Sequence, residues 1–97
     1  GSLKEMFEKG PPPEAFIENQ GAGRGRHGWL YKFAAFACRD GHPLGTVVSW
    51  LVDLDDRFTR KFYYNGQPQP DQHRQLQHLA EKAFQDAEAE PRARLYR

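Results

Sequence analysis

The stretch GWLYKFAAFAC, residues 28–38, decides the fold that the sequence predicts. Its side chains alternate between two sides of an extended chain. One side holds Trp29, Tyr31, Phe33, Ala35 and Ala37, and the other holds Leu30, Lys32, Ala34, Phe36 and Cys38. A period of two, rich in aromatic residues, is typical of a β-strand. We therefore predict a strand over residues 29–38.

Two further strands are predicted downstream of this one. The segment TVVSWLVDL, residues 46–54, is apolar on both faces, as expected of a central strand, and RFTRKFYYN, residues 57–65, provides a third. Turn signals separate the three segments at Asp40-Gly41 and Asp55-Asp56, and Asn65-Gly66 closes the last one. Three neighbouring strands with short connections predict an antiparallel β-meander.

Helices are predicted on either side of this meander. Ser2 and Glu5 have the spacing of a capping box, and Gly10 can end the short helix that follows. After Asp71, a good N-cap, the apolar residues recur at helical spacing: Leu76, Leu79, Ala80, Ala83, Phe84 and Ala87. The predicted fold class is therefore α+β, with a short N-terminal helix, a three-stranded antiparallel β-meander and a long C-terminal amphipathic helix packed on the sheet.

The predicted core joins that C-terminal helix to the sheet. Its members are Leu76, Leu79, Ala83 and Phe84 from the helix and Phe33, Val48, Trp50, Val52 and Phe62 from the strands. One helix covers only one face of a sheet, so the other apolar face needs a second cover. The N-terminal helix, a second protein chain and a nucleic acid are the three candidates.

Length and composition bound the remaining alternatives. The 97 residues suit one domain, residues 1–97, in which Gly1-Ser2 is interpreted as a remnant of cloning and residues 91–97 as a loosely held basic tail. The net charge of +1 provides no global field toward nucleic acid or membrane. A single cysteine, Cys38, excludes an internal disulfide and favours a reducing, cytoplasmic location. No apolar run approaches the roughly 20 residues of a membrane span, so no membrane partner is expected.

The glycine-rich segment GRGRHG, residues 23–28, matches the letters G-x-G-x-x-G. The dinucleotide-binding motif needs a strand before these glycines and a helix N-terminus after them. In this sequence prolines and a polar turn precede the glycines, and the predicted aromatic strand follows them. We therefore reject a dinucleotide site.

Basic residues in this region suggest a different ligand. Arg24, Arg26, Lys32 and Arg39 are the only charged residues from Gly21 to Arg39, so this segment holds four positive charges and no acid. Basic loops beside aromatic strands combine phosphate attraction with stacking platforms for unpaired bases. The candidate nucleic-acid-binding residues are Arg24, Arg26, Trp29, Tyr31, Lys32, Arg60, Lys61 and Tyr63. The alternative is that the aromatic side chains form core and the arginines are solvated.

The sequence holds no convergent set of reactive groups. The carboxylates of Asp53, Asp55 and Asp56 are interpreted as turn formers rather than metal ligands, because aspartates at turns bond the local backbone. His73 and His78 are five residues apart on the predicted helix, so they cannot share a metal ion. We expect no enzyme activity, no catalytic residue, no metal and no cofactor.

These observations predict a non-catalytic protein-interaction module that belongs to a larger protein or assembly. Its contact would be the uncovered sheet face or the sheet edge, and self-association as a dimer is the simplest form of it. The alternative function is a single-stranded nucleic-acid-binding domain that uses the arginine- and glycine-rich loop and the strand aromatics.

Overall fold

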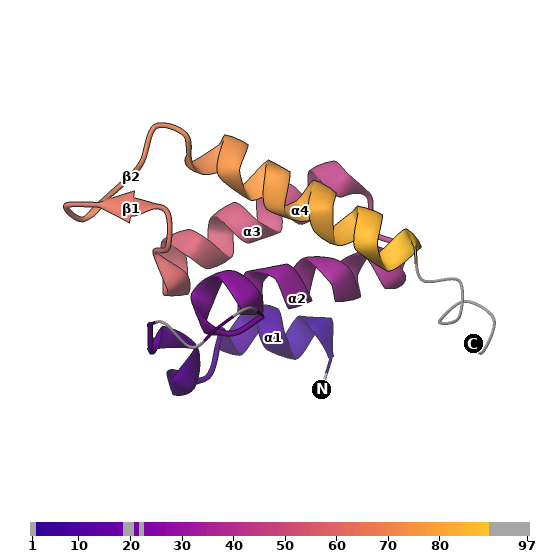
Figure 1. Ribbon diagram of the computed structural model, residues 1–97, viewed down its shortest axis with the longest axis horizontal. Helices are drawn as coiled ribbons and strands as arrows, with labels where there is room; N and C mark the ends of the chain where they lie inside the picture. Colours follow the sequence, from indigo (N-terminus) through magenta and orange to yellow (C-terminus); the bar gives the residue numbers. More distant parts are fainter. Residues whose placement is uncertain (1, 19–20, 22, 90–97) are drawn as a thin grey trace.

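The computed structural model describes residues 2–18, 21 and 23–89, and this part of the chain is mostly helical (Figure 1). Its α-helices are α1 (Leu3–Lys9), α2 (Gly25–Arg39), α3 (Leu44–Leu54) and α4 (Gln72–Glu88). A 3₁₀ turn, η1 (Pro13–Phe16), precedes α2, and a π-helical turn, η2 (Asp55–Thr59), continues α3. The strands β1 (Tyr63–Tyr64) and β2 (Gln67–Pro68) form a small antiparallel hairpin.

The helices pack around α2, which lies in the middle of the molecule. Helix α4 runs alongside α2 and also contacts α3, while α1 packs on the side of α2 away from α4 (Figure 1). The hairpin projects from one end of the molecule, near the start of α2 and the end of η2 (Figure 1). This arrangement brings the N-terminal end of α2, η1 and the chain after η2 to the same end.

The predicted β-meander is wrong, and its first strand is the helix α2. The buried residues of α2 include Leu30, Phe33, Ala34 and Ala37, which follow the helical spacing i, i+3, i+4, i+7. The same residues also alternate with a period of two, and their aromatic side chains favour a strand over a helix. The alanines favour the helix, because alanine has the highest helix propensity.

The second and third predicted strands are also wrong. Residues 46–54 belong to α3, whose buried residues Val47, Val48, Leu51 and Leu54 lie on one helical face. Of residues 57–65, only Tyr63 and Tyr64 are in a strand, and they pair with Pro68 and Gln67. The expected uncovered sheet face is absent from the described residues, so no apolar sheet surface there requires a partner to cover it.

The turn predicted at Asn65-Gly66 is confirmed. It connects β1 to β2 as a two-residue loop, with φ of 51° at Asn65 and 75° at Gly66. Positive φ at both positions is the geometry that favours Asn-Gly in a tight hairpin.

Both predicted helices are present, but the C-terminal helix packs on α2 and α3 and not on a sheet as predicted. The Ser2 hydroxyl accepts a hydrogen bond from the Glu5 backbone N–H at 3.2 Å, and Gly10 ends α1 with φ of 74°. In α4 the residues Leu76, Leu79, Ala80, Ala83 and Ala87 are buried, and Phe84 is half-buried. The predicted core residues do cluster, but Phe33, Val48, Trp50 and Val52 reach the cluster from helices rather than strands.

A buried carboxylate organises the turn between α3 and the hairpin. Asp55 is fully buried and accepts hydrogen bonds from the backbone N–H groups of Lys61 at 2.6 Å and Phe62 at 3.2 Å. The Thr59 hydroxyl and the Gln72 side-chain amide, the latter at 3.0 Å, donate to the same carboxylate. Asp55 therefore joins η2, the start of the hairpin and the first residue of α4, which agrees with its interpretation as a turn former.

No helix in the described ranges combines the length and apolar character needed to cross a membrane. The predicted loosely held tail, residues 91–97, and Gly1 of the predicted cloning remnant lie outside the described residues.

We expect Asp55→Asn to lower the free energy of unfolding by about 1–3 kcal/mol, because an amide accepts through one oxygen and leaves a buried donor unpaired. Chemical denaturation followed by circular dichroism measures this loss. Asp53→Asn is the matched control, since the exposed Asp53 carboxylate pairs only with Arg57 and such surface pairs contribute about 0–1 kcal/mol. Equal midpoints for the two variants would contradict the organising role of Asp55.

Candidate functional site

The glycines of GRGRHG pack a loop tightly onto the first turn of α2. Gly28 is buried, and a Cβ atom built on it would lie 2.4 Å from the carbonyl carbon and oxygen of Gly23. Gly23 and Gly25 have φ of 80° and 77°, values that residues with a side chain rarely adopt. The three glycines therefore let the chain fold back against α2 and leave the intervening Arg24 exposed.

The structure revises one reason for rejecting the dinucleotide motif. A helix, α2, does begin at Gly25, so the expectation of a strand after the glycines is wrong. The element before them is the 3₁₀ turn η1, whereas the motif needs a strand at that place. The match to G-x-G-x-x-G still lacks the context of a dinucleotide fold.

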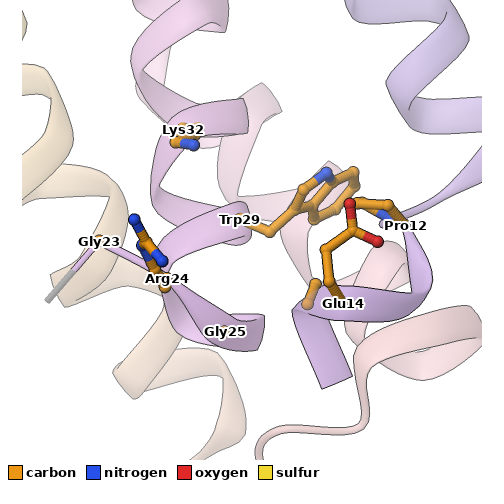
Figure 2. Close-up of a pocket in the computed structure, with 8 residues that line it drawn as sticks. Pro12, Glu14, Gly23, Arg24, Gly25, Trp29 and Lys32 are labelled. Atoms are coloured by element: carbon orange, nitrogen blue, oxygen red, sulfur yellow. The ribbon is translucent and has the colours of Figure 1, made fainter. Parts of the chain in front are cut away.

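Two hollows flank Arg24 at this end of the molecule. The larger one, of about 280 Å³, lies between η1 and α2, and we call it the η1 hollow (Figure 2). It is lined by Pro12, Glu14, Ala15, Gly23, Arg24, Gly25, Trp29 and Lys32. The smaller one, of about 120 Å³, is lined by Ile17, Glu18, Gly21, Arg24, Gly25, Arg26, His27 and Lys61. Arg24 lines both hollows and stands across the η1 hollow from Glu14 (Figure 2).

Three cations around these hollows have no partner among the described residues. The side chains of Arg24, Lys32 and Lys61 make no hydrogen bond or ion pair with any residue that the structure describes. Partial burial and the charge of Lys61 lower the pKa of His27, in the first turn of α2. Positive side chains are unfavourable beside a helix N-terminus, which itself carries partial positive charge. This end of the molecule therefore holds positive charge that an anion would neutralise.

Arg26, a predicted nucleic-acid-binding residue, has a structural role in this fold. Its guanidinium donates to the carbonyl oxygens of Thr59 at 2.9 Å and Arg60 at 3.3 Å, and it pairs with the Glu18 carboxylate at 2.5 Å. These bonds fasten the start of α2 to the end of η2. Arg26 thus positions the site and has little capacity left for a ligand.

Arg60 and Tyr63 are engaged with each other on the hairpin side. The Arg60 guanidinium lies over the Tyr63 ring, 5.0 Å from its centroid, and the Tyr63 hydroxyl donates to Asp56 at 2.7 Å. That hydrogen bond raises the pKa of Tyr63. One face of the predicted stacking ring is therefore covered by a cation.

The other two aromatic candidates point in different directions. Trp29 is half-buried and packs on Phe33, with ring centroids 6.1 Å apart, and it also lines the η1 hollow. Tyr31 donates a hydrogen bond to Asp86 on α4, and this bond lowers the pKa of Asp86. The structure brings Arg24, Trp29 and Lys32 together around one hollow and leaves Tyr31 apart from them.

The segment before the glycines also contributes to the site, although none of its residues was predicted to do so. Glu14 lines the η1 hollow, and next to it Phe16 and Ile17 are 44% and 54% exposed. The prolines at residues 11–13 were the available signal, since a proline can open a helical turn at its first position. That pattern indicates a turn but does not reveal what it packs against.

Within residues 2–18, 21 and 23–89, no three histidine, cysteine or acidic side chains are grouped as metal ligands would be. Comparison with known proteins places the chain in no group: no family model matches, and searches of curated proteins and of solved structures found no similar protein.

We expect Gly28→Ala to destabilise the fold by about 1–3 kcal/mol, because the added methyl group overlaps the Gly23 backbone. Elsewhere in a helix this substitution is favourable by up to about 1 kcal/mol. Gly45→Ala is the matched control, since Gly45 lies in the first turn of α3 with open space around it. Thermal unfolding of both variants measures the difference, and a stabilised Gly28→Ala variant would disprove the tight packing of this loop.

Proposed function

We propose that this chain is a non-catalytic binding module whose basic end holds single-stranded nucleic acid. The observation that carries the proposal is a set of three cations around two adjoining hollows, Arg24, Lys32 and Lys61, none of which has a partner in the described part of the chain. Trp29 supplies an aromatic ring at the edge of the η1 hollow. Cations for phosphates and a ring for a base are the two components of single-strand binding.

The shape of this end favours a single strand over a duplex. A hollow of about 280 Å³ suits one unpaired base, whereas the bases of a duplex are stacked and presented only at the groove edges. The exposed Phe16, directly after the buried Ala15, adds an apolar surface to the same 3₁₀ turn. The net charge of only +1 means that the attraction acts locally.

The proposal is limited to binding because lysine and arginine side chains attract phosphates but supply no nucleophile or general base near neutral pH. A cytoplasmic location remains part of the proposal and rests on the single cysteine, Cys38.

We expect the parent protein to bind a mixed-sequence single-stranded oligonucleotide with a log–log salt slope of about −2, as three neutralised phosphates predict. Replacing Arg24, Lys32 and Lys61 by alanine together should flatten this slope and weaken binding to every sequence alike. Fluorescence polarisation at several salt concentrations measures both effects.

The matched control for this variant removes three exposed cations from other parts of the surface. These are Lys4 on α1 and Arg74 and Lys82 on α4, none of which lines either hollow. The control variant should keep most of the parent's affinity. Equal losses in both variants would mean that the attraction is diffuse, and no binding by the parent at low salt would refute the proposal.

A protein-interaction module is the second candidate function, and an apolar groove favours it. Between α1 and α3 lies a groove of about 320 Å³, lined by Leu3, Lys4, Phe7, Phe33, His42 and Trp50. Three of its aromatic rings pack together. The centroid of the Phe7 ring lies 6.2 Å from that of Phe33 and 6.1 Å from that of Trp50. Grooves of this kind bind apolar side chains of a protein partner, and a second copy of the chain is the simplest one.

If the groove mediates self-association, the molar mass measured by sedimentation equilibrium should rise with protein concentration. Leu3→Glu should suppress that rise, because it places a charge at the edge of the groove without removing a fully buried side chain. A mass equal to the monomer at every concentration would rule out self-association through this surface.

A further inference from the structure

We propose that the η1 hollow takes one unpaired base of the bound strand and prefers guanine, with the Glu14 carboxylate as the group that reads it. This inference rests on the proposed function and names the ligand of the same site. It is carried by one feature of the hollow, a carboxylate that lies among cations and has no partner within the described residues.

The Glu14 carboxylate is exposed and makes no hydrogen bond or ion pair with the described residues, although it lines the same hollow as Arg24 and Lys32. Figure 2 shows Glu14 beside Trp29 and Pro12, with Arg24 on the opposite side and Lys32 farther along α2. A negative charge in a hollow for a phosphate alone would weaken binding. The carboxylate favours binding only if it accepts hydrogen bonds from the ligand, and the N–H groups of a nucleotide that can donate them are on its base.

Backbone hydrogen bonding and burial fix the main chain at Glu14. Pro13 opens η1, the Ala15 N–H donates to the Pro12 carbonyl oxygen at 3.0 Å, and Ala15 is buried at 7% exposure. The turn is therefore anchored on both sides of Glu14. A group held by a fixed backbone can select among ligands with less loss of freedom than one on a loose loop.

The bases differ in what they offer to a carboxylate, which accepts hydrogen bonds but cannot donate them. On its Watson–Crick edge guanine presents two adjacent donors, N1–H and the 2-amino group, which match the two carboxylate oxygens. Adenine and cytosine present one amino group next to a ring nitrogen that repels the carboxylate. Thymine and uracil present one N–H between two carbonyl oxygens, so they are the least favourable.

The remaining lining suits the rest of a nucleotide. Trp29 presents an aromatic ring beside Glu14, which allows a base to stack while its edge meets the carboxylate (Figure 2). Arg24 and Lys32, on the other side of the hollow, are placed for the neighbouring phosphates. The volume of about 280 Å³ leaves room for one base.

The test compares short oligothymidylates that carry one central guanine, inosine, adenine or no replacement. Fluorescence polarisation at low salt should show about tenfold tighter binding of the guanine strand than of the all-thymine strand, as expected for a contact to two donors. The inosine strand should bind with intermediate affinity, since inosine keeps N1–H but lacks the 2-amino group.

Glu14→Gln is the decisive variant. It should bind the guanine and all-thymine strands equally, and it should bind the all-thymine strand at least as tightly as the parent does, because a negative charge near the phosphates is removed. Glu8→Gln is the matched control, with the same change of charge on an exposed part of α1 outside the hollow. This control should keep the preference for guanine.

The outcomes separate this inference from the proposed function. If the parent binds all strands equally while the Arg24, Lys32 and Lys61 variant binds none, the function stands and the base preference is refuted. A guanine preference that persists in Glu14→Gln also refutes the role of Glu14. If the parent binds no strand at low salt, the proposed function itself fails.

Discussion

The fully buried Asp55 carboxylate is the interaction on which the arrangement of the basic end depends. Its bonds to Lys61, Phe62, Thr59 and Gln72 hold η2 in a π-helical turn and join it to the hairpin and α4. The carbonyl groups at the end of that turn receive the guanidinium of Arg26. A buried charged acceptor with four donors is costly to disturb, so this chain of contacts positions the start of α2.

The charges at the N-terminal end of α2 are the opposite of those that stabilise a helix N-terminus. Acidic residues stabilise a helix N-terminus, yet the first turn of α2 has none and is preceded by Arg24. Arg26 is neutralised by Glu18 and by two carbonyl oxygens, whereas the side chains of Arg24, Lys32 and Lys61 have no such partner in the described part of the chain. Cations that have no partner among the described residues are available to bind an anion. The proposed binding of phosphates rests on this contrast. The proposed recognition of a base rests on the Glu14 carboxylate, which has no partner in the described residues either.

Sequence patterns predicted some elements and site residues of this protein and not others. The helix Leu3–Lys9 was predictable from its capping residue Ser2, and the helix Gln72–Glu88 from an apolar stripe that fits helical spacing alone. The segment 29–38 satisfies two periods at once, and its aromatic residues favoured the wrong one. Arg24, Trp29 and Lys32 were identified as candidates from charge and aromaticity. Glu14 was missed, because a turn after prolines carries no signal of what it packs beside.

The sequence by itself determined the local features: where the outer helices begin and end, the tight turn at Asn65-Gly66, and an acid-free basic segment from Gly21 to Arg39. These depend on capping, backbone conformation and charge, which act between residues close in the chain. Only the tertiary structure decided that residues 25–54 are largely helical and which cations remain unpaired. Both depend on contacts between distant residues, since α2 buries its stripe against α4, and Arg26 finds its acceptors more than thirty positions away. Packing of this kind selects between local conformations of similar energy, and a local pattern cannot.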